Sequence, residues 1–129
     1  MDDRKPRADT ALVHPDGRVQ ALWDACPWLA NEPDLEEGPY YVFGVVALRV
    51  IDRGFSTEEE DLIFAHFNAM ALDDADTQNV LIAGALEMLC DPGATAIARA
   101  KLKGRALLYF ERVFRGLPFS KTPQAGRDE

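Results

Sequence analysis

The chain has few side chains that could bind a metal ion. Its only histidines are His14 and His66, and its only cysteines are Cys26 and Cys90. A zinc site needs several such ligands at a converging spacing, and the sequence contains neither an HExxH pattern nor a CxxC pair. In di-iron helical bundles a glutamate stands three positions before each ligating histidine, whereas Ile63 has that place before His66. We therefore expect no metal site and no cofactor.

Nucleophilic catalysis and phosphate binding also lack their usual residues. A catalytic serine or cysteine needs a histidine and an orienting acid beside it. The two serines are Ser56, which has the position of a helix cap, and Ser120, which lies near the C-terminus. The glycines form no GxxxxGKS, GxxxxGKT or GxGxxG pattern, and these patterns mark the common phosphate-binding loops. The sequence therefore predicts a protein that is not an enzyme.

Glu87 is the one plausible acid–base group, because it is the single charged residue in the apolar stretch 80–89. A carboxylate in apolar surroundings is costly unless it is hydrogen-bonded or paired. We expect Glu87 to lie at an edge of the core, with Arg49, Arg99 or Arg105 as partner, and to have a structural role. Catalysis would need a second positioned group, and the sequence identifies none.

The charges are distributed unevenly along the chain, whose formal net charge is −8. Residues 31–91 contain 14 acidic and two basic side chains, whereas residues 93–129 contain eight basic and three acidic ones. A net negative charge disfavours binding to nucleic-acid phosphates and to anionic membrane surfaces. It is compatible with a basic protein partner.

Two interpretations of this distribution stay open. In the first, the acidic and basic halves of a helical hairpin pair with each other. In the second, carboxylates at the starts of two successive helices form one acidic face that binds basic residues of a partner. The candidate contact residues are Glu58, Glu59, Asp61, Asp73, Asp74 and Asp76.

The hydrophobic pattern predicts that helices position these residues within one domain. A chain of 129 residues has the length of a single domain. We expect a flexible segment over 1–14, a helical domain over 15–116 and an irregular tail over 117–129. The predicted fold is all-α, a bundle or stack of five to six antiparallel helices. Apolar residues at helical spacing place these helices at about 18–29, 40–52, 56–71, 77–89 and 94–115.

Local signals indicate several boundaries. A solvated acidic loop is expected over 31–38, and Gly104 should divide the last helical stretch. Ser56 and Glu59 form a capping-box pattern, and one of the aspartates in 73–76 should cap the next helix.

The stretch 40–52 is ambiguous. Its aromatic and β-branched residues favour a strand, whereas its length favours a buried helix, so both assignments stay open. Gly44 and Gly84 interrupt apolar helices, where a missing side chain lets another helix approach closely.

The sequence also bears on location. The N-terminal residues include no apolar stretch typical of a secretory signal, and the longest apolar run, 80–86, is too short to span a bilayer. The two cysteines, 64 positions apart, are expected as buried thiols in a reducing compartment. We therefore expect a cytoplasmic protein that does not enter a membrane.

A longer pattern joins several of these residues. An IF pair is followed by an aspartate, an asparagine and a GxLExL segment, and then by an amphipathic final helix. The matching residues are Ile63, Phe64, Asp76, Asn79, Gly84, Leu86, Glu87 and Leu89. With this pattern, residues 18–116 resemble a family of small acidic bacterial proteins of uncharacterised function. The chain departs from that family at Asn68, where the family often has glutamate.

The resemblance implies an all-helical protein that confers immunity to a polymorphic or contact-dependent toxin. It also implies that Gly84 and Glu87 serve the shared architecture. We therefore expect a stoichiometric binding protein that neutralises a cognate bacterial toxin with a basic surface by occlusion. The alternative is a non-enzymatic scaffold or adaptor that could self-associate through an exposed apolar patch containing Trp28, Phe43 or Phe119. The oligomeric state stays open.

Overall fold

The computed structural model describes residues 14–31 and 37–116. The predicted N-terminal segment up to residue 13, most of the acidic loop (32–36) and the tail over 117–129 lie outside the described residues. His14 belongs to the domain, one residue earlier than predicted, because it is buried. Its Nδ1 atom accepts a hydrogen bond from the Asp16 amide at 2.9 Å, and its ring packs edge-on against Trp23.

The described residues form helices and no strand, so the predicted all-α fold is confirmed. The stretch 40–52 is therefore helical. Because α5, η3 and α6 follow one another without a break, they form one continuous rod. The described residues then contain six helices besides the short 3-10 helix η1. The elements are α2 (Gly17–Ala25), the 3-10 helix η1 (Pro27–Asn31), α3 (Pro39–Ile51), α4 (Thr57–Met70), α5 (Ala75–Asn79), the π-helix η3 (Val80–Leu86), α6 (Glu87–Leu89), α7 (Thr95–Lys101) and α8 (Gly104–Phe114).

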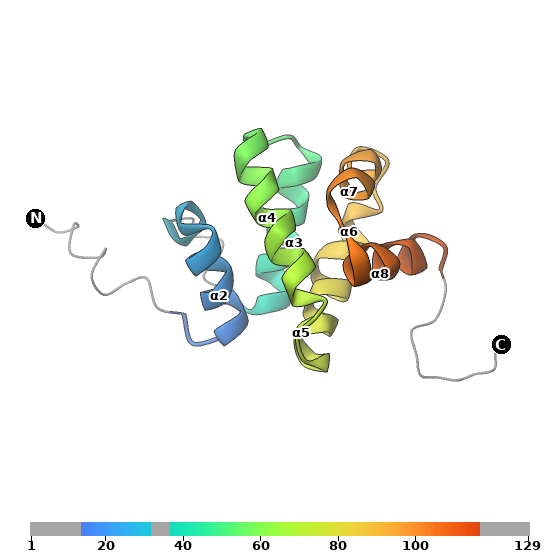
Figure 1. The fold of residues 1–129 in the computed structure, drawn as a ribbon. Helices are drawn as coiled ribbons and strands as arrows, with labels where there is room; N and C mark the ends of the chain where they lie inside the picture. The colour runs from blue at the N-terminus through green and yellow to red at the C-terminus, as the bar shows by residue number, and fades with distance from the viewer. Residues whose placement is uncertain (1–13, 32–36, 117–129) are drawn as a thin grey trace, which may run out of the picture.

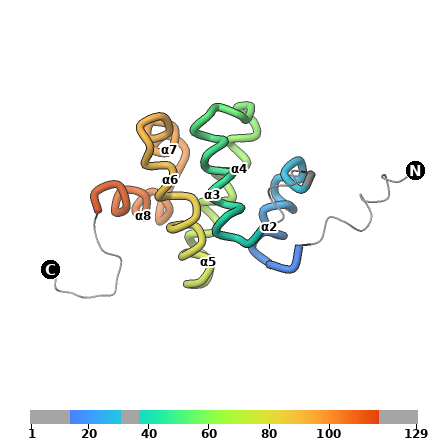
Figure 2. Tube along the Cα trace, turned by 180° about the vertical axis from the view of Figure 1, so that it is seen from behind, coloured from blue at the N-terminus to red at the C-terminus, as the bar shows by residue number. Residues whose placement is uncertain are grey.

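The helices α3 and α4 stand at the centre of the molecule, with α2 on one side and α7 and α8 on the other (Figure 1). The chain rises through α3, descends through α4 and rises again through the rod, so α4 is antiparallel to both neighbours. Seen from behind, α3 lies in front of α4 (Figure 2). The rod and α3 run in parallel, because Gly84 lies beside Tyr40 at the start of α3 and Gly93 lies beside Ile51 at its end.

Aromatic side chains form the centre of the core. Four phenylalanines are buried here: Phe43 on α3, Phe64 and Phe67 on α4, and Phe110 on α8. The ring centroid of Phe67 lies 6.2 Å from that of Phe43 and 5.6 Å from that of Phe64. The tilted and edge-on angles of these pairs are those that aromatic rings prefer. The expectation that Phe43 contributes to an exposed patch is wrong, because α3 turns this residue towards α4 and the rod.

Side chains cap the helices where their sequence predicts. The Ser56 hydroxyl accepts a hydrogen bond from the Glu59 amide at 3.1 Å, and the Glu59 carboxylate accepts one from the Ser56 amide at 2.8 Å. This confirms the capping box. Among the aspartates in 73–76, Asp74 is the cap of α5, since its Oδ1 atom accepts a hydrogen bond from the Thr77 amide at 2.8 Å.

Gly44 and Gly84 bring α3 and the rod into backbone contact, as predicted. A Cβ atom on Gly84 would lie 3.2 Å from Cβ of Phe43, and one on Gly44 would lie 3.3 Å from the carbonyl oxygen of Gly84. The rod is π-helical at this contact, which its sequence did not predict. Its outer side is also less enclosed than predicted, because Met88 is exposed.

Asn68 on α4 holds the short link between α7 and α8. Its Nδ2 group donates a hydrogen bond to the Lys101 carbonyl at 3.3 Å. Its Oδ1 atom accepts one from the Lys103 amide at 2.9 Å. The amide therefore uses both its donor and its acceptor, which a glutamate at this position could not do.

Replacing Asn68 with alanine should lower the free energy of unfolding by about 1–3 kcal/mol, because two hydrogen bonds to the link are lost. Asn79 is exposed on α5, so Asn79→Ala is a matched control that should change stability by about 0.5 kcal/mol or less. Urea unfolding of both variants checks this. Equal stability of the two would contradict the assigned role of Asn68.

Within the described ranges, no helix combines the length and apolar character that a membrane span requires.

Candidate functional site

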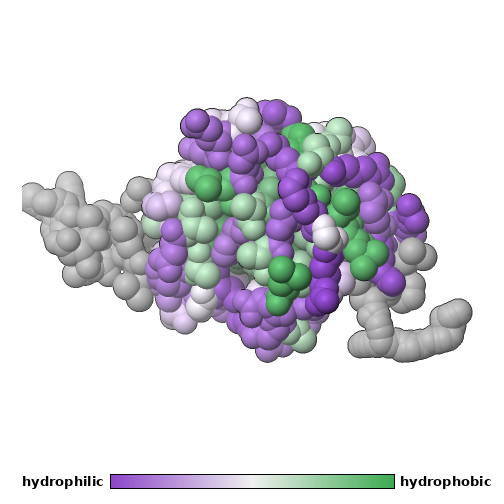
Figure 3. Space-filling model, in the orientation of Figure 1, coloured by the Kyte–Doolittle hydropathy of each residue, from purple (hydrophilic) through white to green (hydrophobic). Residues whose placement is uncertain are grey.

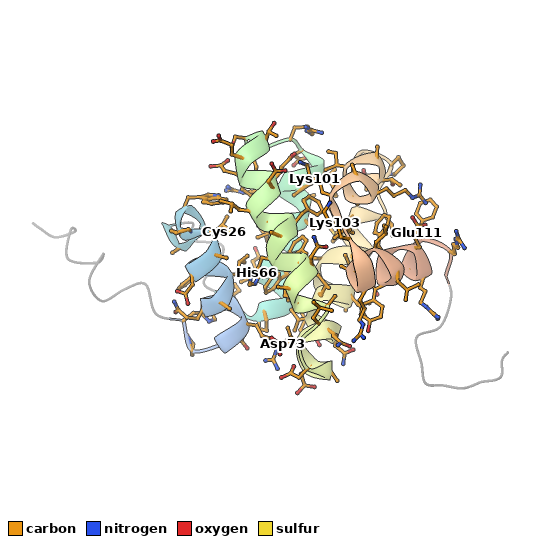
Figure 4. The ribbon with its side chains drawn as sticks, in the orientation of Figure 1. Cys26, His66, Asp73, Lys101, Lys103 and Glu111 are labelled. Atoms are coloured by element: carbon orange, nitrogen blue, oxygen red, sulfur yellow. The ribbon has the colours of Figure 1, made fainter. Side chains whose placement is uncertain are left out.

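The six predicted contact residues lie in two groups at opposite ends of α4. This helix has 14 residues, so its ends are about 21 Å apart at 1.5 Å per residue. Glu58, Glu59 and Asp61 lie at its beginning, whereas Asp73 lies just beyond its end (Figure 4). The prediction of one acidic face is therefore wrong. Successive helices that run antiparallel begin at opposite ends of the molecule, so their N-termini do not share a surface.

Two of the three residues in the first group interact with other residues of the same chain. Glu59 belongs to the capping box, and Asp61 forms an ion pair with Lys101 of α7. Glu58 is exposed. For Asp61, the interpretation in which acidic and basic halves of the chain pair with each other is therefore correct.

Two members of the second group, Asp74 and Asp76, lie beside one arginine of α2. The Nη2 atom of Arg18 lies 3.9 Å from both Asp74 and Asp76, and its Nε donates a hydrogen bond to Thr77 at 3.1 Å. The side chains of Asp74 and Asp76 remain 67% and 85% exposed. Hydrogen bonds from Thr77, together with the charge of Arg18, lower the pKa of Asp74. Asp74 is therefore anionic at neutral pH, and the group faces solvent.

A groove of about 340 Å³ opens between α2 and α4 next to this group. The surface in Figure 3 is hollowed here, with hydrophilic side chains along its lower border. Small or apolar residues line its walls and polar ones its rim. The lining residues are Gly17, Arg18, Ala21, His66, Ala69, Met70, Asp73, Asp74 and Thr77.

His66 forms part of the groove wall and also touches the core. Its ring is stacked with Phe43, with centroids 6.4 Å apart and planes inclined by 9°. Burial lowers the pKa of His66 below its usual value, so the ring is neutral at pH 7. The prediction that His66 is a partly exposed helix residue is confirmed. No local signal in the sequence indicated that α2 would lie opposite it.

The lowered pKa of His66 predicts a loss of stability in acid. Below about pH 6.5 the unfolded chain binds a proton at this residue more readily than the folded chain does. The free energy of unfolding therefore decreases as the pH is lowered. Between about pH 7.5 and 5, the wild-type protein should therefore lose more stability than a His66→Phe variant, which keeps an aromatic ring. Urea unfolding of both proteins at several pH values tests this. Parallel losses would contradict it.

Glu87 lies at the edge of the core, as predicted, and is exposed. The predicted partner Arg99 binds Glu111 instead, with N–O distances of 2.8 and 3.1 Å. Burial, together with the negative charge of Glu87, raises the pKa of the Cys90 thiol. The ion pair of Arg99 is therefore with Glu111, and the exposed Glu87 gains no structural role from this arginine.

Within residues 14–31 and 37–116 the buried carboxylate is Glu60, which was not among the predicted site residues. Its side chain is 2% exposed, and its Oε2 atom lies 3.8 Å from Nη2 of Arg53. Glu60 precedes Ile63 and Phe64 by three and four positions, so it belongs to the buried stripe of α4. That spacing could have identified it.

Among residues 14–31 and 37–116, no group of three or more histidine, cysteine, aspartate or glutamate side chains could hold a metal ion. The groove between α2 and α4 is the candidate site because the exposed Asp73 and Asp74 line it, and it could recognise a ligand by charge and shape. Comparison of the chain with protein-family models, curated proteins and solved structures found no match.

Proposed function

We propose that this protein is a stoichiometric, non-enzymatic binding protein of the immunity type. It neutralises a cognate bacterial toxin in the cytoplasm by covering a basic surface of that toxin. The contact surface is the acidic end of the molecule, which we define as Asp73, Asp74, Asp76 and the adjoining groove between α2 and α4. Glu58, Glu59 and Asp61 lie outside this surface.

One observation carries the proposal. Asp73 and Asp74 line the groove together with Arg18, Asp76 lies beside the same arginine, and all three aspartates are exposed. The chain as a whole has a net charge of −8, which attracts a basic protein from a distance. Complementary charge of this kind raises the association rate and selects the correct partner.

Co-expression with the product of the neighbouring gene tests the proposal. The two proteins should purify as a 1:1 complex by light scattering, and cells that make both should grow where cells that make the neighbour alone do not. Proteins that remain separate on mixing, together with growth that is not protected, would contradict the proposal.

A self-associating scaffold is the second candidate, and one observation favours it. Tyr41 and Leu48 lie on the outer side of α3 and are 51% and 45% exposed. Two of the residues expected for such a patch do not support it, since Phe43 is in the core and Trp28 packs against Phe55. The third, Phe119, lies outside the described residues.

Light scattering separates the two candidates. We expect a mass of 14.3 kDa that does not change with concentration. A mass that rises to that of a stable dimer, and returns to the monomer value in a Tyr41→Ser/Leu48→Ser variant, would favour the scaffold instead.

A further inference from the structure

We propose that the groove between α2 and α4 accepts a single lysine or arginine side chain of the partner. Its aliphatic stem lies along Ala21, Ala69 and Met70, and its charged end lies beside Asp73 and Asp74. This inference rests on the proposed function and specifies how the acidic end recognises its partner.

The walls of the groove suit an aliphatic stem. The methyl groups of Ala21 and Ala69 and the side chain of Met70 offer apolar surface without hydrogen-bonding groups. A volume of about 340 Å³ is at the lower end of the range for binding pockets, which suits one side chain better than a large ligand. Long basic side chains bury their methylene groups on such a surface and keep the charge near water.

The rim of the groove suits a cation. The Oδ1 atom of Asp73 accepts a hydrogen bond from the Asp74 amide. The Oδ1 atom of Asp74 accepts one from the Thr77 amide. Within the described ranges we find no hydrogen bond to the Oδ2 atom of either residue. These two oxygens can therefore accept charge-assisted hydrogen bonds from an ammonium or guanidinium group.

The chain already places one guanidinium in this environment. Arg18 lies within 3.9 Å of Asp16, Asp74 and Asp76, but these distances exceed those of hydrogen bonds. Asp73 lines the same groove, and His66, which also lines it, is neutral. The net charge of the site therefore disfavours an anion and favours a second cation.

Titration of the full chain with N-acetyl-arginine amide, followed by NMR of the backbone amides, tests this inference. Saturable shifts should appear at Ala21, Ala69, Asp73 and Asp74. N-acetyl-norleucine amide, which has an uncharged stem, should shift them much less. Shifts that are equal for the two compounds, or that spread over the whole acidic surface, would overturn the inference.

Charge-neutral variants localise the effect. Asparagine retains the oxygen that each aspartate uses locally, so Asp73→Asn/Asp74→Asn should fold normally and weaken arginine amide binding about tenfold or more. The matched control Glu58→Gln/Glu59→Gln removes the same charge at the other end of α4 and keeps the capping box, so it should bind as the wild type does. Equal weakening in both double variants would overturn the inference.

A steric variant tests the groove itself. Ala69→Trp fills it without a change of charge and should abolish the saturable shifts, whereas Ala65→Trp, one turn earlier on the exposed side of α4, should not. If the toxin complex forms and is insensitive to Ala69→Trp, the groove inference fails while the proposed function stands. If arginine amide binds in the groove but no complex with the toxin forms, the proposed function fails.

Discussion

Replacing Phe43 with alanine is expected to lower the free energy of unfolding by about 3–5 kcal/mol. Phe43 is fully buried, contacts Phe67, and stacks with His66. Its removal leaves a cavity at the point where α3, α4 and the rod meet. Urea unfolding monitored by circular dichroism gives the free energy directly.

The control for this change is Tyr41→Ala, two positions earlier on the opposite side of α3. Because Tyr41 is exposed, its loss should cost about 1 kcal/mol or less. If the two variants are equally stable, the orientation of α3 is not the one described, and Phe43 would belong to an exposed patch after all.

Replacing Gly84 with leucine is expected to destabilise the protein by about 3 kcal/mol or more. The new Cβ atom alone would lie 3.2 Å from Cβ of Phe43 and 3.4 Å from the carbonyl oxygen of Tyr40. A full side chain must therefore push α3 away from the rod. Thermal and urea unfolding measure the loss.

Gly17 provides the matched position for this test. It lies in the first turn of α2, where an added Cβ meets no atom within 4 Å. Gly17→Leu should therefore leave stability nearly unchanged, because only a helix-propensity term remains. A Gly84→Leu variant as stable as Gly17→Leu would contradict the close approach of α3 to the rod.

Features encoded by neighbouring residues could be predicted from the sequence. The capping box of Ser56 and Glu59, the break at Gly104 and the cap within 73–76 depend on residues a few positions apart. Helical periodicity also predicted the all-α fold. For residues 40–52, local propensity left both helix and strand open. In the structure this stretch is a helix that packs against α4 and the rod.

Features that depend on the path of the chain could not be predicted. The acidic residues at the starts of two helices are near each other in sequence, but α4 separates Glu58 from Asp74 by its whole length. Arg18, which meets Asp74, comes from 56 positions earlier. The π-helical contact at Gly84 likewise requires knowledge of which helix lies opposite.

The distribution of charge combines both original interpretations. Asp61 pairs with Lys101 inside the chain, and the lysine comes from the basic C-terminal part, as the pairing interpretation predicted. Asp74 and Asp76 pair with Arg18 from α2. The acidic end proposed to meet a partner therefore has, among the described residues, one arginine as its ion-pair partner, and its carboxylates otherwise face solvent.

The association rate constant with the toxin tests this proposal most directly. At low salt, Asp73→Asn/Asp74→Asn/Asp76→Asn should slow association about tenfold and flatten its salt dependence. Glu58→Gln/Glu59→Gln/Asp61→Asn, with the same change in net charge, should have a much smaller effect. If the two triple variants slow association equally, or neither does, the acidic end of the molecule is not the surface that recognises the partner.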